Sequence, residues 1–288
     1  MLSLNNNFLI TCELAPPKGP NFDELIENAR PLKGLVNAIN ITDGQGGNMR
    51  MNSVIASYLV QREIPEIETI CQFVCRDRNQ IGLQGDILGG YALGLRNFLA
   101  LSGDKAAGGD HPKAKDVFDF STDCLIKTFK QFALGLDFAG NKINEPLSQI
   151  KLGAAAHPGV EDLKTQAAKM KQRSQEGVNF FQTQIVYEEE QLKRFLDSVS
   201  DIKEPVLIGI TPLKSVKMAL FMNEKVFGVQ VPTAIIERLE KAPNATQEGI
   251  KIALELIEKI KQLGGHGVHI MAIGQEKELA NIIKQIVV

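Results

Sequence analysis

The chain has 288 residues, of which 44% are hydrophobic and 23% charged, and these are ordinary values for a folded globular protein. The 32 lysines and arginines and the 34 aspartates and glutamates leave a formal charge of −2, which gives no sign of a nucleic-acid-binding surface. No apolar run approaches the roughly 18 residues that a membrane-spanning helix needs, and residues 1–7 are polar with no leader pattern. We therefore expect a cytoplasmic protein with no nucleic-acid partner and no membrane span.

The four cysteines, Cys12, Cys71, Cys75 and Cys124, fit a reducing compartment. Only Cys71 and Cys75 lie close in sequence, and no second pair or nearby histidine completes the four ligands of a structural zinc site. The four also do not resemble an iron–sulfur cluster motif. We expect buried thiols that pack as small apolar side chains, and no bound metal.

Short β-rich runs alternate with longer helical stretches along the chain. The runs are nearly continuous in Ile, Val, Leu, Phe and Ala, which is typical of strands buried in a parallel sheet. The expected strands are Phe8–Glu13, Ala38–Thr42, Glu68–Cys75, Asn97–Leu101, Lys151–Ala156, Phe180–Val186, Val206–Ile210 and Val268–Ala272.

Helical spacing of apolar residues and helix-boundary residues mark the stretches between these strands. The expected helices are Phe22–Leu32, Ser53–Arg62, Ile81–Leu93, Ser121–Leu134, Glu161–Glu176, Glu188–Val199, Thr233–Lys241, Glu248–Leu263 and Lys277–Val287.

Eightfold alternation of strand and helix predicts a parallel sheet that closes into a single (β/α)8 TIM barrel domain over residues 1–288. An open doubly wound sheet is the alternative, but the Gly-rich dinucleotide fingerprint is absent after the first strand, where residues 13–17 read ELAPP. The long polar segment Ser102–Val117 follows the fourth strand, which places it at the carboxyl-terminal mouth of the barrel.

Active sites of such barrels lie at the carboxyl ends of the strands. Glu13 ends the first strand among apolar neighbours, and burial there is expected to raise its pKa, as a general acid near neutral pH requires. A strand-end glutamate paired with a lysine is the alternative. Asp104 follows Ser102 and Gly103, where the backbone can approach a ligand closely, and a turn aspartate is its alternative.

Amide and imidazole side chains mark other strand ends. Gln184 follows Thr183 in an apolar strand, and its amide offers both donors and an acceptor to a heterocycle, unless neighbours satisfy it. His157 is a ligand candidate or a loop histidine, whereas His266 and His269 fit a structural role at the entry to the last strand. No G-x-S-x-G or P-loop segment is present, so nucleophilic hydrolysis and nucleotide phosphoryl transfer are not favoured.

Five segments resemble those of the methylenetetrahydrofolate reductase family, in the same order along the chain. They are Ile10–Pro17 (ITCELAPP), Asn40–Asp43 (NITD), Leu99–Asp104 (LALSGD), Gly177–Gln184 (GVNFFQTQ) and Ile208–Pro212 (IGITP). They are similar to the family's glutamate with paired prolines, its second strand end, and its Leu-x-Gly-Asp, Thr-Gln and Gly-Ile-x-Pro segments. The resemblance runs from residue 8 to about residue 274, which is nearly the whole chain.

The resemblance implies a barrel that reduces 5,10-methylenetetrahydrofolate to 5-methyltetrahydrofolate through a bound flavin, FAD or alternatively FMN. It implies that Glu13 is the general acid and that Asp104 is a catalytic carboxylate near the flavin and the pterin. The implied substrate-binding residues are Gln184, Asp43 and Asp104. The implied flavin-binding residues are Thr42, Gln72, Ser102, Gly103, Asp104, His157, Lys169 and Arg173.

Three positions depart from the better-known members of the family. Gln72 stands where they have a histidine, Ser102 where they have an arginine, and Asp43 where they more usually have a tyrosine. The segments 110–119 and 267–274 resemble a branch found in acetogens and in reductases fused to homocysteine methyltransferases. The implied electron donor is therefore either NAD(P)H or a partner subunit with an iron–sulfur centre, and an oligomer is expected.

Two other functions are open to a barrel with these residues. One is a non-redox barrel that binds methyltetrahydrofolate as an interaction subunit, and the other is a corrinoid-linked methyltransferase. Glu13, Asp104 and Gln184 together favour the reductase, because a protein that only binds the folate needs no proton donor at its bridge nitrogen.

Overall fold

The structure is a computed structural model that describes residues 1–4, 8–272 and 275–287. Gly274, which ends the last segment compared with the family, lies outside these residues. Each expected strand is present, with ends shifted by at most two residues. The strands are β1 (Leu9–Leu14), β2 (Ala38–Ile41), β3 (Thr69–Val74), β4 (Asn97–Leu101), β5 (Lys151–Ala156), β6 (Phe180–Ile185), β7 (Val206–Ile210) and β8 (Gly267–Ile270).

The strands form a closed barrel in sequence order, β1 to β8, and this confirms the predicted (β/α)8 architecture. The pairing is parallel between β2 and β3, β3 and β4, and β4 and β5. It is also parallel between β6 and β7, β7 and β8, and β8 and β1. Parallel neighbours bring the carboxyl ends of successive strands to one edge, so the loops that follow them gather there.

Helices follow the strands as predicted, with one addition. The helices are α1 (Asp23–Ala29), α2 (Ser53–Glu63), α3 (Gln80–Ala92), α4 (Thr122–Ala133), α5 (Leu163–Gln175), α6 (Glu189–Ser198), α7 (Val216–Lys225), α8 (Thr233–Lys241), α9 (Ala245–Gln262) and α10 (Leu279–Val287). The sequence did not predict α7. Its Leu220 and Phe221 are more than half exposed, so the apolar residues of this helix do not follow one buried stripe.

The chain divides into two compact units. The first comprises Met1–Ser3, Glu13–Ala154 and Arg173–Phe180, and the second comprises Leu4–Cys12, Ala155–Gln172 and Phe181–Val288. The prediction that residues 1–288 form one domain stays a prediction.

In the first unit, alternation along β3 separates a helix-facing side from an inner side. The thiol of Cys71 lies 3.7 Å from the hydroxyl of Ser53 in α2. The ring of Phe73 packs against Phe98 and against Phe129 of α4, with centroids 6.0 and 6.2 Å away. Because successive side chains of a strand point to opposite faces, the side chain of Gln72 lies on the inner face of the sheet.

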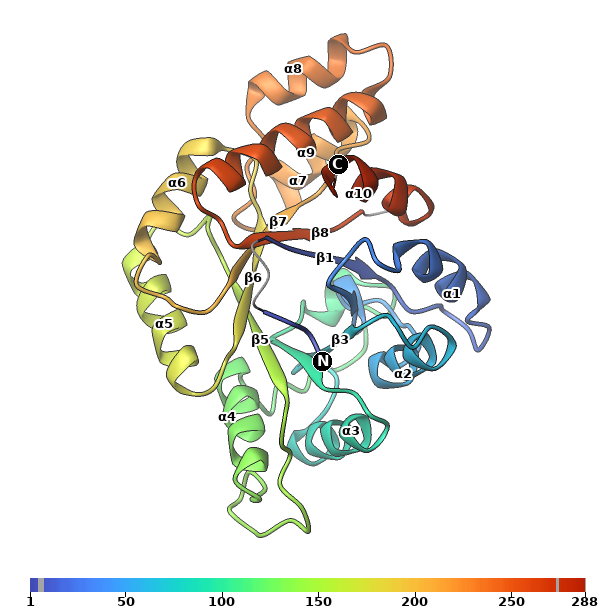
Figure 1. Cartoon of the computed structure of the whole chain (residues 1–288), viewed down its shortest axis with the longest axis vertical. Coiled ribbons are helices and arrows are strands. Elements are labelled where there is room, and N and C mark those ends of the chain that lie inside the picture. Colours follow the sequence, from blue (N-terminus) through green and yellow to red (C-terminus); the bar gives the residue numbers. More distant parts are fainter. Residues whose placement is uncertain (5–7, 273–274, 288) are drawn as a thin grey trace. The chain divides into compact units, whose positions relative to one another are not determined.

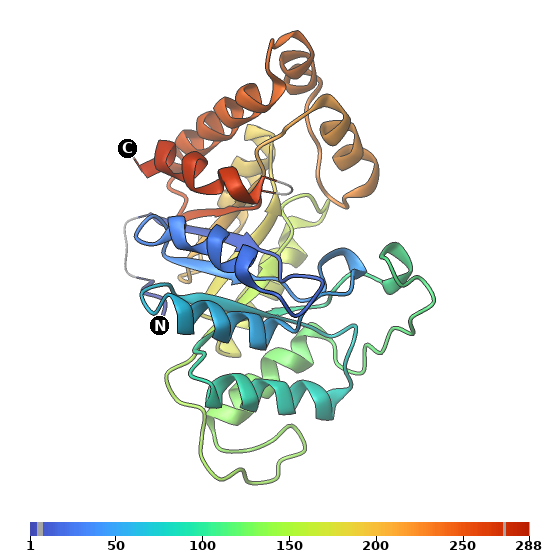
Figure 2. The same ribbon diagram turned by 90° about the vertical axis from the view of Figure 1, so that its right-hand side faces the viewer.

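In the second unit, an ion-pair network joins α8 to α9, which lie side by side in Figures 1 and 2. Arg238 of α8 lies 2.6 Å from carboxylate oxygens of both Glu248 and Glu255 of α9. Asn244 caps α9 by accepting a hydrogen bond from the backbone N–H of Gln247. This cap explains why α9 begins three residues before the predicted Glu248.

Gly153 of β5 leaves no room for a side chain, since an added Cβ would lie 2.4 Å from Cζ of Phe180 and 2.8 Å from Cδ1 of Leu99. We expect Gly153→Ala to lower the free energy of unfolding by about 1–3 kcal/mol through overpacking. Gly85→Ala in α3 is the matched control, because nothing lies within 4 Å of its added Cβ and alanine favours a helix by about 1 kcal/mol. Denaturant unfolding measures both, and equal shifts of the same sign would contradict the packing argument.

Candidate functional site

Glu13, the predicted general acid, is the one residue of β1 that is half-buried, while the other five are buried. Its Oε1 accepts a hydrogen bond of 3.0 Å from Nε2 of Gln45, which belongs to the loop after β2. The side chain is less buried than its apolar neighbours in the strand, because it contacts an exposed polar side chain at the strand end. That hydrogen bond fixes the orientation of the carboxyl group.

Thr42 ends β2 and is buried, with 1% of its surface exposed. Its backbone N–H donates to the carbonyl oxygen of Leu14, which holds the ends of β1 and β2 together. Its hydroxyl oxygen has no hydrogen-bond partner among the described residues. A buried hydroxyl without a partner is costly, and either a ligand atom or an ordered water would supply the missing bond.

Asp43, the next residue, is buried and has several protein partners. One carboxylate oxygen accepts from the backbone N–H of Val74 at 2.9 Å and forms an ion pair with Arg78. Arg78 also pairs with Asp86 at 2.8 Å. Burial raises the pKa of Asp43, although the guanidinium of Arg78 acts in the opposite direction. These contacts favour a structural role for Asp43, and substrate binding by this residue stays a prediction.

The predicted flavin-binding residues of β3 and β4 differ in exposure. Gln72 is buried at 7% exposure, and Ser102 is exposed while its carbonyl oxygen accepts from the backbone N–H of Cys75. Gly103 has a φ of +88°, and an added Cβ would lie 2.9 Å from Cβ of Val74, so the position requires glycine.

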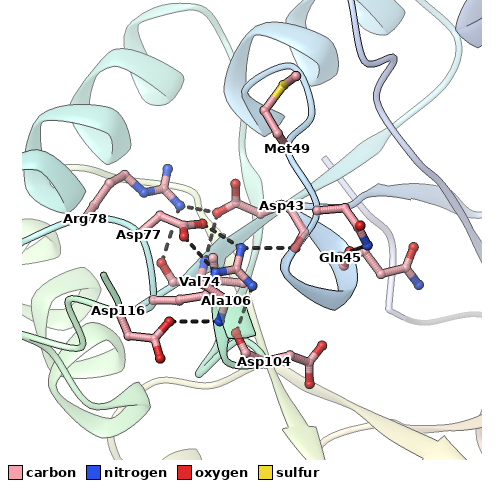
Figure 3. Close-up of polar contacts among 12 residues, drawn as sticks. Asp43, Gln45, Met49, Val74, Asp77, Arg78, Asp104, Ala106 and Asp116 are labelled. Atoms are coloured by element: carbon pink, nitrogen blue, oxygen red, sulfur yellow. Dashed lines mark hydrogen bonds and ion pairs between the residues drawn. The ribbon is translucent and has the colours of Figure 1, made fainter. Parts of the chain in front are cut away.

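Asp104 is exposed, and its carbonyl oxygen accepts a 3.0 Å hydrogen bond from Nη1 of Arg76. Arg76 is buried, and its Nε and Nη2 donate to the two carboxylate oxygens of Asp77 at 2.7 and 2.6 Å. Figure 3 shows the side chains of Asp43, Asp77 and Arg78 close together, with Asp104 apart from them on the other side of Ala106. Arg76 is not among the site residues that the sequence predicts.

The segment after Asp104 is a structured loop. Its one helical turn, Ala106–Gly108, is held by the carboxylate of Asp116, which accepts from the backbone N–H of Ala106 at 2.8 Å (Figure 3). Asp110 accepts from Nζ of Lys18 at 2.6 Å and from the backbone N–H of Met49 at 2.9 Å. The Lys18 ammonium group holds the pKa of Asp110 well below its usual range. Asp110 therefore ties the loops after β1, β2 and β4 together.

In the second unit, the predicted pterin ligand Gln184 lies at a break in the sheet. The register of β6 against β7 shifts between Gln182 and Ile185, as a β-bulge does. Oε1 of Gln184 accepts from the backbone N–H of Ile185 at 3.0 Å. Because that bond identifies the oxygen, the amide nitrogen with its two N–H donors points elsewhere. Bulges re-aim side chains beside active sites, and Gln184 is half-buried there.

The three remaining predicted flavin-binding residues differ in their surroundings. His157 and Lys169 are exposed in the second unit. Arg173 is buried in the first unit, where its Nε donates to Asp123 of α4 at 2.8 Å. The charge of buried Arg173 therefore has a partner within the protein. Its flavin-binding role stays a prediction.

A buried polar network in the second unit was not anticipated. The hydroxyl of Thr11 lies 3.0 Å from Nδ1 of His269 and accepts from Nε2 of Gln182 at 3.1 Å. All three side chains are less than 5% exposed. The expected structural role of His269 fits this network, and His269 lies within β8 as it does in the predicted strand.

Three of the cysteines are buried and Cys124 is half-buried. Burial raises the pKa of Cys71 to about 12 and that of Cys75 to about 11, so both are unreactive thiols. Within residues 1–4, 8–272 and 275–287, no group of three or more His, Cys, Asp or Glu side chains could hold a metal ion. No helix in the same residues has the length and apolar character to cross a membrane.

Comparison with known proteins gives one family and several distant relatives. The family model described as methylenetetrahydrofolate reductase matches residues 1–287. "Methylenetetrahydrofolate reductase 1" of Schizosaccharomyces pombe is 20% identical over 86% of this chain and 40% of its own length. "Probable methylenetetrahydrofolate reductase (NADPH)" of Caenorhabditis elegans is 23% identical over 95% of this chain and 41% of its own. The chain thus spans about two-fifths of the length of these curated relatives.

The unpaired hydroxyl of Thr42 predicts an unusual response to substitution. We expect Thr42→Val to raise the free energy of unfolding of the ligand-free chain by about 1 kcal/mol, because it removes a buried group that lacks a partner. Thr11→Val is the matched control, since it breaks the bonds to Gln182 and His269 and lowers stability by about 1–3 kcal/mol. Denaturant unfolding distinguishes the signs, and a loss of stability in Thr42→Val would show that its hydroxyl has a partner.

Proposed function

Because the chain belongs to the methylenetetrahydrofolate reductase family, we propose that it catalyses the flavin-dependent reduction of 5,10-methylenetetrahydrofolate to 5-methyltetrahydrofolate. The proposal rests on two groups at the ends of adjacent strands. Glu13 provides an oriented carboxyl group, and Thr42 provides a buried hydroxyl without a hydrogen-bond partner. The first supplies a proton donor and the second a ligand-binding atom.

The unpaired hydroxyl of Thr42 supports the proposed flavin site. The Thr42 hydroxyl would hydrogen-bond a polar atom of the ring. Val74 and Arg76 fill the space where a side chain of Gly103 would lie, so a flavin would contact Gly103 only through its backbone. Gln72 in β3 offers an amide, and Ser102 directly after β4 offers a further hydroxyl. A bound flavin, FAD or alternatively FMN, would supply the hydride chemistry that no side chain provides.

Glu13 would act on the folate. Opening the methylene bridge breaks a carbon–nitrogen bond, and the leaving nitrogen needs a proton to become a stable amine. The carboxyl group of Glu13 would donate that proton while Gln45 holds it in place through Oε1. The carbon becomes an iminium, and its reduction gives the methyl group of the product.

Asp104 and Gln184 would recognise the pterin. The amide N–H donors of Gln184 would bind ring acceptors, because its oxygen is already bonded to Ile185. The exposed carboxylate of Asp104 would accept hydrogen bonds from the pterin and would disfavour an anionic reduced flavin through its negative charge.

The electrons would come from NAD(P)H or from a partner subunit with an iron–sulfur centre. Cys12, Cys71 and Cys75 are buried as free thiols, so any cluster would belong to the partner. The donor does not affect the folate half-reaction, which can therefore be tested alone.

The test is an anaerobic absorption spectrum of the flavin-loaded chain before and after addition of 5-methyltetrahydrofolate. Bleaching of the flavin is expected. A bound flavin that is not bleached would contradict folate reduction, and failure to bind FAD or FMN would favour the non-redox folate-binding barrel.

Glu13→Gln preserves the size of the side chain and its acceptor for Gln45, but removes the acid. We expect folate–flavin exchange to slow by about 100- to 10,000-fold, the usual contribution of a general acid. Reduction of the flavin by dithionite should be unchanged. Stopped-flow absorbance measures both reactions, and equal loss of the two would contradict the assignment of Glu13.

Gln184→Ala removes the proposed pterin donor. We expect the Kd of 5-methyltetrahydrofolate to rise about threefold to tenfold, as for one lost hydrogen bond, with flavin affinity unchanged. Gln262→Ala, an exposed glutamine at the end of α9 in the same unit, is the matched control and should leave the Kd unchanged. Isothermal titration decides, and an unchanged Kd for Gln184→Ala would remove it from the site.

A further inference from the structure

The guanidinium of Arg76 lies where three strand-end loops meet, and only 3% of its side chain is exposed. It donates to the carbonyl oxygen of Gly44, after β2, and to that of Asp104, after β4, each at 3.0 Å. Asp77, after β3, accepts from it through both carboxylate oxygens. One side chain therefore connects the loops of three consecutive strands.

The main chain of Arg76 holds the far end of the segment Ser102–Val117 as well. Its carbonyl oxygen accepts from the backbone N–H of Val117 at 2.7 Å. The side chain thus fixes the segment near its beginning, at Asp104, and the backbone fixes it at its end.

Two glycines make space for this arrangement. An added Cβ on Gly44, whose φ is +58°, would lie 2.5 Å from Nη2 of Arg76. An added Cβ on Gly103, whose φ is +88°, would lie 3.4 Å from Cβ of Arg76. The backbone on both sides therefore packs directly against this arginine.

A lysine could not replace these contacts. The planar fork of arginine directs its donors along fixed lines, so one group reaches two carbonyl oxygens and a bidentate carboxylate at once. The single ammonium group of lysine has one centre and cannot span acceptors on three loops in the same geometry.

We propose that Arg76 is a positioning residue that sets Asp104 in place for the folate–flavin reaction. The inference rests on the proposed function for the role of Asp104, whereas the connection of the loops rests on the contacts alone. Arg76 acts through the backbone of Asp104, so its effect on the reaction should disappear when the Asp104 carboxylate is removed.

The test is a double-mutant cycle with Arg76→Lys, Asp104→Asn and the double variant. We expect Arg76→Lys to slow folate–flavin exchange by about 10- to 100-fold, as misplacement of a reacting group does. In the Asp104→Asn background the same change should have no further effect on the rate. An equal slowing in both backgrounds would overturn the proposal, since it would show a general structural effect.

The flavin midpoint potential of each variant provides a second measurement for the double-mutant cycle, and it requires no turnover. Arg76→Lys should shift the potential only when Asp104 is present. Arg96→Lys is the matched control, because Arg96 also donates to two backbone carbonyl oxygens, at the opposite end of β4. It should change neither rate nor potential.

Hydrogen exchange separates failure of this inference from failure of the proposed function. Arg76→Lys should speed amide exchange in residues 102–117, whereas Arg96→Lys should not. Equal exchange in the two variants overturns the proposal whether or not the chain reduces folate. If Arg76→Lys does not fold, Asp77→Asn weakens the contacts of the Arg76 guanidinium while Arg76 is retained. The same rate, potential and hydrogen-exchange measurements then apply.

Discussion

A buried guanidinium is stable only when acceptors surround it, and Arg76 obtains them from the loops after β2, β3 and β4. Two of those loops adjoin a residue of the candidate site: Thr42 directly precedes the first, and Asp104 lies in the last. The requirement that one charge be satisfied therefore fixes the relative placement of groups from different strands. Asp110 adds a second tie that extends to the loop after β1 through Lys18.

Adjacent residues at the end of β2 show how hydrogen-bond satisfaction separates structural from ligand-binding groups. Asp43 bonds to Val74 and pairs with Arg78, so binding a ligand would cost it existing contacts. The hydroxyl of Thr42 has no partner within the described part of the chain, so a ligand would supply a missing bond without breaking one. The physical argument favours Thr42 over Asp43, although both stand in segments that resemble the family.

The fold was predictable because buried strands produce a local pattern of apolar residues in the sequence. Strands enclosed on both faces are continuous apolar runs, and β4, β5 and β7 have the predicted bounds. Helix α7 has no such pattern, because exposed Leu220 and Phe221 interrupt its apolar stripe. Its N-cap residue, Ser215, is the one local signal of where it begins. The division into two compact units also has no local signal, since no linker composition accompanies it.

The sequence could place the candidate site residues at strand ends, but it could not predict their contacts. Glu13 and Asp104 could be placed from the rule that strand ends carry the chemistry. Their partners could not, because Gln45 lies 32 residues from Glu13 and Arg76 lies 28 residues from Asp104. Arg173 lies 50 residues from its partner Asp123, so the sequence could not predict this ion pair either. Whether a strand-end side chain is available to a ligand depends on these distant partners. The sequence can therefore identify a candidate residue, and only the folded chain shows which groups that residue already contacts.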